Sequence, residues 1–244
     1  MFQKKELCAY VYSLLVLTFV FGFDDGSEIF VLENWLMNLL KVFFMVLIVF
    51  FLKESGHKIM ARWRDCIVEY RVWTISSLWF SASSKLKKPF RLGIWLPLLI
   101  SFLTQGGLAL TFTGEHVSKG IRTKRVGRIW THVTDYERSL ICVGGYMMLA
   151  VFLIVLNVLN KFFGFDVDLF VRITFFMVIF NYIPFHRLDG SYIFFGGKLI
   201  YVISLIFVVL SYLLFSVGLG WGVFISLVIA LLIAGILFYR WNQV

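Results

Sequence analysis

Long apolar runs separated by short polar segments are the dominant pattern of this chain. An α-helix needs roughly 20 mostly apolar residues to cross a membrane. Runs that approach this length lie at about 7–23, 35–52, 139–159, 198–217 and 219–239, and a sixth, interrupted by a few polar residues, lies at 169–185. The pattern therefore predicts an all-α polytopic membrane protein with about six transmembrane helices, the last two forming a C-terminal helix pair at 198–239.

The charged residues between these runs predict the orientation of the helices. The segment 24–34 carries four acidic residues and no basic one, whereas 53–92 carries nine basic and three acidic residues. Basic segments of membrane proteins tend to stay in the cytoplasm, so we expect 24–34 outside and 53–92 inside. This assignment predicts an integral, multi-pass membrane protein with both termini in the cytoplasm.

The segment 93–110 is apolar, yet it has basic segments on both sides. A complete crossing would place one of them outside, and the segment also contains Pro97 and the polar break 104–107. We therefore expect a re-entrant or interfacial element here. The region of about 66–135 predicts a small cytoplasmic, partly β insertion, because its stretch "EYRVWTISSLWF" alternates as a strand does.

The composition agrees with a membrane protein and limits the classes of partner that we expect. Hydrophobic residues make up 60% of the chain and charged residues only 15%, against about a quarter in soluble proteins. The net charge is +9, and the basic residues lie between the apolar runs, where they can contact anionic lipid headgroups. We therefore expect the lipid bilayer and no nucleic acid as a partner. The three cysteines have no CxxC spacing and indicate neither a disulfide framework nor a thiolate zinc site.

Two polar stretches interrupt the apolar pattern. "FLKESGHK" (51–58) follows a long apolar run, and "FNYIPFHRLDGSYIFFG" (180–196) places an asparagine, a proline and an aspartate in or beside a membrane helix. Burying such polar groups in lipid is energetically unfavourable, so their presence indicates a functional role. The simpler alternative is that both stretches are helix ends at the membrane surface, with Asp189-Gly190 as an ordinary turn.

Together, the two stretches resemble the site-2 protease family of intramembrane zinc metallopeptidases, of the archaeal or bacterial type. The family motifs are H-E-x-x-H on one membrane helix and N-x-x-P-x-x-x-L-D-G on another. The second motif is complete from Asn181 to Gly190, and the first is present only at Glu54 and His57. The resemblance covers about 50–200 and implies a single membrane domain, 1–244, with a protease-like core at about 35–200.

The resemblance implies an enzyme that cleaves a single-pass membrane protein with one zinc ion, which three protein ligands hold and which activates a bound water. The implied roles are general base for Glu54, substrate or oxyanion contact for Asn181, and zinc ligand for His57, Asp189 and, as a further candidate, His186. The implied substrate-binding positions are Val68, Tyr70 and Val72, because a strand of the insertion would pair with an extended substrate, and Pro184 of the second motif. We expect ligand atoms of His57 and Asp189 roughly 3–4 Å apart.

Lys53 stands where the first histidine of the family motif should be. An ammonium group has no lone pair for a metal, and its charge repels Zn²⁺. A neutral Lys53 amine or His186 would each supply a third ligand. Two functions stay open: a zinc protease impaired by the loss of one ligand, and an inactive pseudoprotease that binds membrane helices or partner proteins. A transporter or channel is a third class, but paired discontinuous helices are missing.

The other histidines and a glycine pair have simpler explanations. We expect His116 and His132 to face solvent, because both lie in polar segments. The pair Gly144-Gly145 either matches a turn of the family loosely or forms a contact between packed helices.

Overall fold

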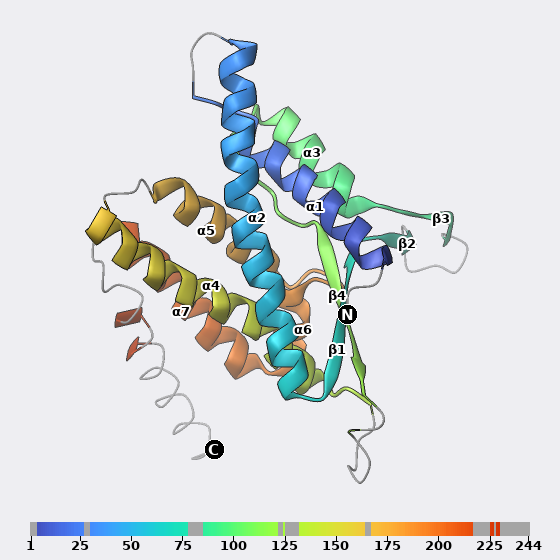
Figure 1. Ribbon diagram of the computed structural model, residues 1–244. Helices are drawn as coiled ribbons and strands as arrows, with labels where there is room; N and C mark the ends of the chain where they lie inside the picture. Colours follow the sequence, from blue (N-terminus) through green and yellow to red (C-terminus); the bar gives the residue numbers. More distant parts are fainter. Residues whose placement is uncertain are drawn as a thin grey trace. The chain divides into compact units, whose positions relative to one another are not determined.

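The computed structural model of the chain is mostly helical, and the residues that it describes form two small sheets (Figure 1). It describes residues 4–26, 30–77, 85–121, 124, 132–163, 167–216, 225–226 and 228–229. The helices are α1 (Lys4–Gly22), α2 (Leu32–Trp63), α3 (Leu92–Leu103), α4 (Asp135–Phe163), α5 (Asp168–Tyr182), α6 (Asp189–Gly196) and α7 (Lys198–Ser216). The predicted segments up to residue 217 are thus confirmed as helices, while their crossing of a membrane stays a prediction, and the predicted helix 219–239 lies almost wholly outside the described residues.

Helix α2 is longer than the apolar run that predicts it. The run ends at Leu52, whereas the helix continues to Trp63. The simpler alternative, in which the stretch 51–58 with Glu54 and His57 is a helix end, is therefore wrong. The polar residues after Leu52 end the apolar run but include no proline, and most of them favour a helix, so the backbone continues until the turn at Asp65, whose φ is 54°.

The strands lie in the region predicted to be a partly β insertion. They are β1 (Cys66–Val72), β2 (Ile75–Ser77), β3 (Lys85–Phe90) and β4 (Gly114–Gly120), and β1 pairs with β4 while β2 pairs antiparallel with β3. The single strand expected from "EYRVWTISSLWF" is interrupted at 73–74, and its last residues, 78–80, lie outside the described residues.

The chain forms two compact units. Unit 1 comprises Met1–Ile48 and Glu69–Val117, and unit 2 comprises Val49–Val68 and Ser118–Val244. In unit 1, α1 lies along α3, as Figure 1 shows. The Phe23 and Phe102 rings meet edge to face, and the Trp35 indole donates a hydrogen bond to the Phe23 carbonyl.

The segment predicted to be re-entrant starts and ends beside the same residue of unit 1. The Gly93 amide donates to the Trp73 carbonyl, and the Trp73 amide donates to the Thr113 carbonyl, each at 3.0 Å. Between these points α3 has 12 residues, which is about 18 Å of helix and too short for a membrane core of about 30 Å. The segment therefore returns to where it began, and its relation to a membrane stays a prediction.

Unit 2 is built around α4, which contacts α5, α6 and α7. One part of its core is an apolar cluster that includes the C-terminal half of α4 and the start of α5. Its buried residues are Ala150, Leu153, Leu156, Val167, Val171 and Phe207. The opposite part holds the C-terminal turns of α2 and contains the buried polar residues of the predicted site.

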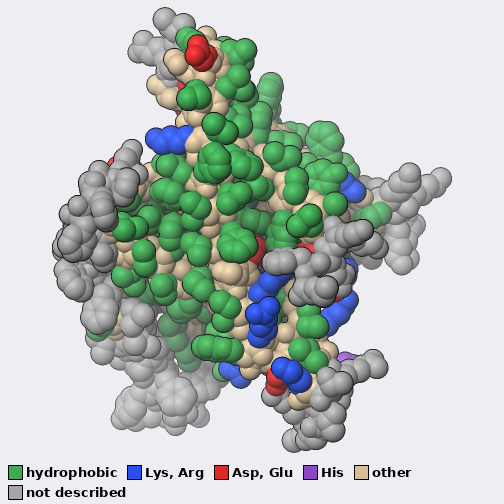
Figure 2. Space-filling view, in the orientation of Figure 1, with side chains coloured by type: hydrophobic (Ala, Val, Ile, Leu, Met, Phe, Trp, Pro, Cys, Tyr) green, Lys and Arg blue, Asp and Glu red, His purple; other side chains and the backbone are tan. Residues whose placement is uncertain are grey.

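Two helices of the described residues, α2 and the Asp135–Asn157 part of α4, are long and apolar enough to cross a membrane. Large apolar side chains are exposed along both, among them Met37, Phe44 and Phe51 on α2 and Val151 and Val155 on α4. Figure 2 shows hydrophobic side chains over much of the visible face.

Candidate functional site

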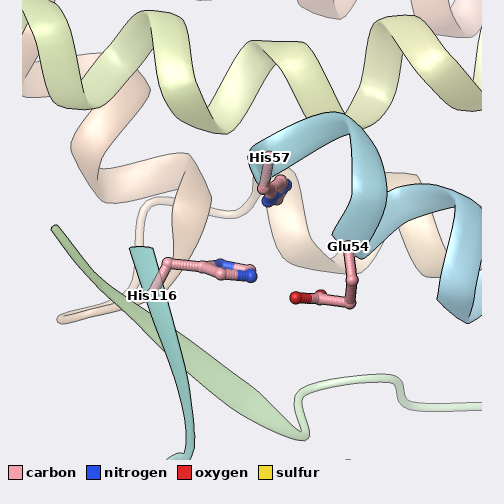
Figure 3. Close-up of side chains that lie close together, drawn as sticks. All are labelled: Glu54, His57 and His116. Carbon is pink, nitrogen blue, oxygen red and sulfur yellow. The ribbon is translucent and has the colours of Figure 1, made fainter. Parts of the chain in front are cut away.

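The residues of the degenerate first motif are all buried on α2. Lys53 and His57 are four residues apart and therefore lie on one side of the helix. Their exposed fractions are 4% and 0%, and that of Glu54 is 5%. Figure 3 shows Glu54 and His57 projecting from this part of α2, and a carboxylate oxygen of Glu54 lies within 4.8 Å of an imidazole nitrogen of His57. The sequence motif therefore faces the interior of unit 2.

Glycines allow α2 to approach α4 closely at this point. A Cβ atom on Gly56 would lie 2.6 Å from the Gly144 carbonyl oxygen, and one on Gly145 would collide with the His57 ring. Neither contact leaves room for a larger residue. The pair Gly144-Gly145 is thus a contact between packed helices, and it lets the His57 ring lie directly against α4.

The second motif forms the end of α5, a turn and the start of α6. The side-chain amide of Asn181 donates to the Met177 carbonyl, one helical turn earlier, at 2.7 Å. Pro184 is exposed in the turn that follows α5. Gly190 packs against the Tyr182 carbonyl, where a Cβ atom would collide. This close turn brings Asp189, the first residue of α6, into the interior with an exposed fraction of 2%.

The two motifs meet at the Asp189 carboxylate. Its Oδ2 atom lies 3.5 Å from Lys53 Nζ and 3.8 Å from His57 Nε2. The expected proximity of His57 and Asp189 is therefore confirmed, while their role as zinc ligands stays a prediction. The geometry also shows that the Lys53 ammonium group faces this carboxylate.

Two residues of α4 that the sequence reasoning missed complete the surroundings of Asp189. The Tyr146 hydroxyl donates to Oδ2 at 2.6 Å, and the Cys142 thiol lies 3.8 Å from Oδ1 as a weak donor. Cys142 and Tyr146 are four residues apart and flank the glycine pair on the same side of α4. The i,i+4 spacing predicts that the two residues share one face of the helix, but it does not indicate a contact with Asp189.

The predicted residue set does not fit a catalytic zinc site. His57 and Asp189 offer lone pairs, whereas Lys53 offers only hydrogens. The carboxylate oxygen closest to His57 faces the Lys53 ammonium, so an ion bound there would meet a positive charge. His186 is exposed in the turn between α5 and α6.

The predicted substrate-binding strand has two of its side chains in the interior. Val68 packs with Ala61, Cys66 and Ile141 in unit 2. Tyr70 is buried in unit 1, where its hydroxyl donates to Ser13 at 2.7 Å and its amide donates to Glu6 at 3.3 Å. Val72 is half-buried. The substrate-binding role of these residues stays a prediction.

The expectation for His116 is wrong. This residue lies in β4 with an exposed fraction of 3%, and its ring meets the Tyr70 ring edge to face. Its polar sequence neighbours suggested solvent, but the pairing of β4 with β1 places the imidazole beside a buried tyrosine. His132 is exposed, as expected.

No family model matches this chain, and neither a curated protein nor a solved structure shows significant similarity to it. The likeness to the site-2 protease family therefore rests on the motifs alone.

Proposed function

We propose that this chain is a pseudoprotease of the site-2 protease type: an integral membrane protein that keeps the two motif stretches of an intramembrane protease without its zinc chemistry, and that binds a membrane helix of a partner protein. The observation that carries the proposal is the buried ion pair between Lys53 Nζ and Asp189 Oδ2, at 3.5 Å. In this pair the lysine supplies the positive charge that zinc would supply in an active relative.

The chemistry of the other site residues supports this function over an active protease. Catalytic zinc sites use three protein ligands and keep a fourth position for water. Here the candidate carboxylate oxygen already accepts a hydrogen bond from Tyr146 and faces Lys53. Glu54 keeps the position of the general base, but without a metal ion the water that it would activate is not made more acidic.

The proposal includes a membrane setting with about six transmembrane helices and cytoplasmic termini. Support comes from the two helices that are long enough to span and from the apolar side chains exposed along them. The returning segment around α3 fits a re-entrant element, because both of its ends then lie on one side of the membrane. The exposed apolar surfaces of α2 and α4 suit contact with lipid or with a partner helix.

Metal analysis and a cleavage assay on the purified full chain test the proposal. We expect the wild-type protein to retain no stoichiometric zinc, even after zinc addition, and to leave a single-pass transmembrane reporter intact in proteoliposomes. Lys53→His should raise zinc affinity by orders of magnitude, because it adds a second imidazole on the face of His57 and removes the cation.

The matched control is Glu54→Gln in the wild-type and Lys53→His backgrounds. It should leave zinc binding of the Lys53→His variant nearly unchanged, because Glu54 is not one of the predicted ligands. Stoichiometric zinc in the wild-type protein, together with reporter cleavage that Glu54→Gln abolishes, would overturn the proposal and establish an active protease.

A further inference from the structure

Lys53 makes two contacts that are typical of ammonium recognition. Its Nζ atom lies 3.5 Å from Asp189 Oδ2 and 5.7 Å from the centre of the Tyr146 ring. A cation within about 6 Å of an aromatic ring centre is attracted by the ring, and the attraction is strongest where water is excluded. Both ends of the ion pair are at least nine-tenths buried. The ammonium group is thus held by a carboxylate and an aromatic ring in the interior of unit 2.

Tyr146 contributes to this arrangement in two ways. Its ring faces the ammonium, and its hydroxyl donates to the same carboxylate oxygen at 2.6 Å, which holds the counter-ion in place. The ring itself is fixed by Tyr182, at 4.7 Å between ring centres, and by His57, at 5.8 Å. The Tyr146 ring is therefore held between two other rings as well as by its contacts with the ion pair.

We infer that Asp189 and Tyr146 form a binding site for a primary ammonium group, which Lys53 fills from within the chain. The inference rests on the proposed function, since it treats the site as one that takes an ammonium and not zinc. Acceptor atoms and a π face satisfy an ammonium group, whereas a catalytic zinc ion needs three protein ligands with lone pairs at about 2.0–2.2 Å. The lysine also ties α2 to α4 and α6, a structural task that a shared metal ion would perform.

Chemical rescue of Lys53→Ala tests the inference. This substitution removes three carbons and the nitrogen, which is the composition of n-propylamine, and the neutral amine crosses lipid to reach a buried site. We expect the full-length variant to melt at a lower temperature than the wild type. Saturating n-propylammonium chloride should raise its melting temperature by about 3–6 °C over the same concentration of sodium chloride.

Matched variants separate the site from general effects of the amine. The wild-type protein should show no rise, because Lys53 already fills the site. The Lys53→Ala/Asp189→Asn variant should show none either, because the counter-ion is missing. Lys53→Ala/Tyr146→Phe should keep part of the rise, since the ring remains, and Lys53→Ala/Tyr146→Leu should lose more of it.

Two results would overturn the inference: no rise in Lys53→Ala, or an equal rise in the wild type or the Asp189→Asn background. If Lys53→Ala does not fold alone, the yield of monodisperse protein purified in n-propylammonium chloride against sodium chloride replaces the melting temperature, with the same variants and criteria. Zinc-dependent cleavage by the wild type would instead contradict the proposed function. Absent rescue with a zinc-free wild type would contradict only the ammonium site.

Discussion

At the scale of single residues, the stability of the site depends on the buried ion pair between Lys53 and Asp189. Burying two charges has a large desolvation cost, which a close partner and further hydrogen bonds offset. Asp189 has such support, because Tyr146 and Cys142 both contact its carboxylate. Removing one member of a buried pair is therefore more damaging than removing both.

The first prediction concerns this coupling. Asp189→Asn leaves the Lys53 ammonium buried without a counter-ion, so we expect a loss of about 3–5 kcal/mol in the free energy of unfolding. Adding Lys53→Met should recover much of that loss, because the remaining groups are neutral and similar in size. Thermal or denaturant unfolding of the two single variants and the double variant gives the coupling energy. Additive losses would show that the two side chains do not interact.

At the scale of elements, the crossing of α2 and α4 decides whether the site can form. His57 contacts the backbone of α4 only because residue 145 is glycine. The same close approach brings the Tyr146 ring to within 5.8 Å of the His57 ring. The glycine pair is therefore a condition for the site as well as a packing contact.

The second prediction tests this crossing. Gly145→Ala should destabilise the protein by about 1–3 kcal/mol, because its Cβ atom collides with the His57 ring and the helices must separate. This is the opposite of the small gain that alanine brings in an unconstrained helix. Met147→Ala, at an exposed position of the same helix, is the control and should stay within about 0.5 kcal/mol of the wild type. Equal stability of the two variants would remove the argument for a tight crossing.

At the scale of the whole molecule, the returning segment around α3 determines the proposed membrane topology. Arg91 and Lys119 are exposed on either side of this segment, and Phe102, near the end of α3, has an exposed fraction of 70%. A segment that enters and leaves on one side places its flanks in the same compartment.

The third prediction follows from this geometry. In a Cys8→Ser background, cysteines at positions 91 and 119 should react with a membrane-impermeant maleimide from the cytoplasmic side only. A cysteine at position 102 should react only after detergent is added, because lipid covers it. Labelling of 91 and 119 from opposite sides would mean that the segment crosses the membrane. Rapid labelling at 102 in intact vesicles would place α3 in water.

The sequence by itself determined the helical segments and the two motif stretches. Apolar runs near the length of a membrane helix located α1, α2, α4, α5 and α7, since burying such runs requires a regular backbone. The spacing of Lys53 and His57 fixed their common helix face. Hydropathy could not locate the end of α2, because a helix continues through polar residues that favour it.

The tertiary structure alone decided what surrounds Asp189 and where His116 lies. Tyr146 and Asp189 are 43 residues apart, and their 2.6 Å contact depends on how α4 and α6 pack, which no local pattern encodes. The burial of His116 likewise depends on strand pairing between distant segments. Lys53, His57 and Asp189 were thus readable from the sequence as site residues, but the α4 partners of the Asp189 carboxylate required the packing of three helices.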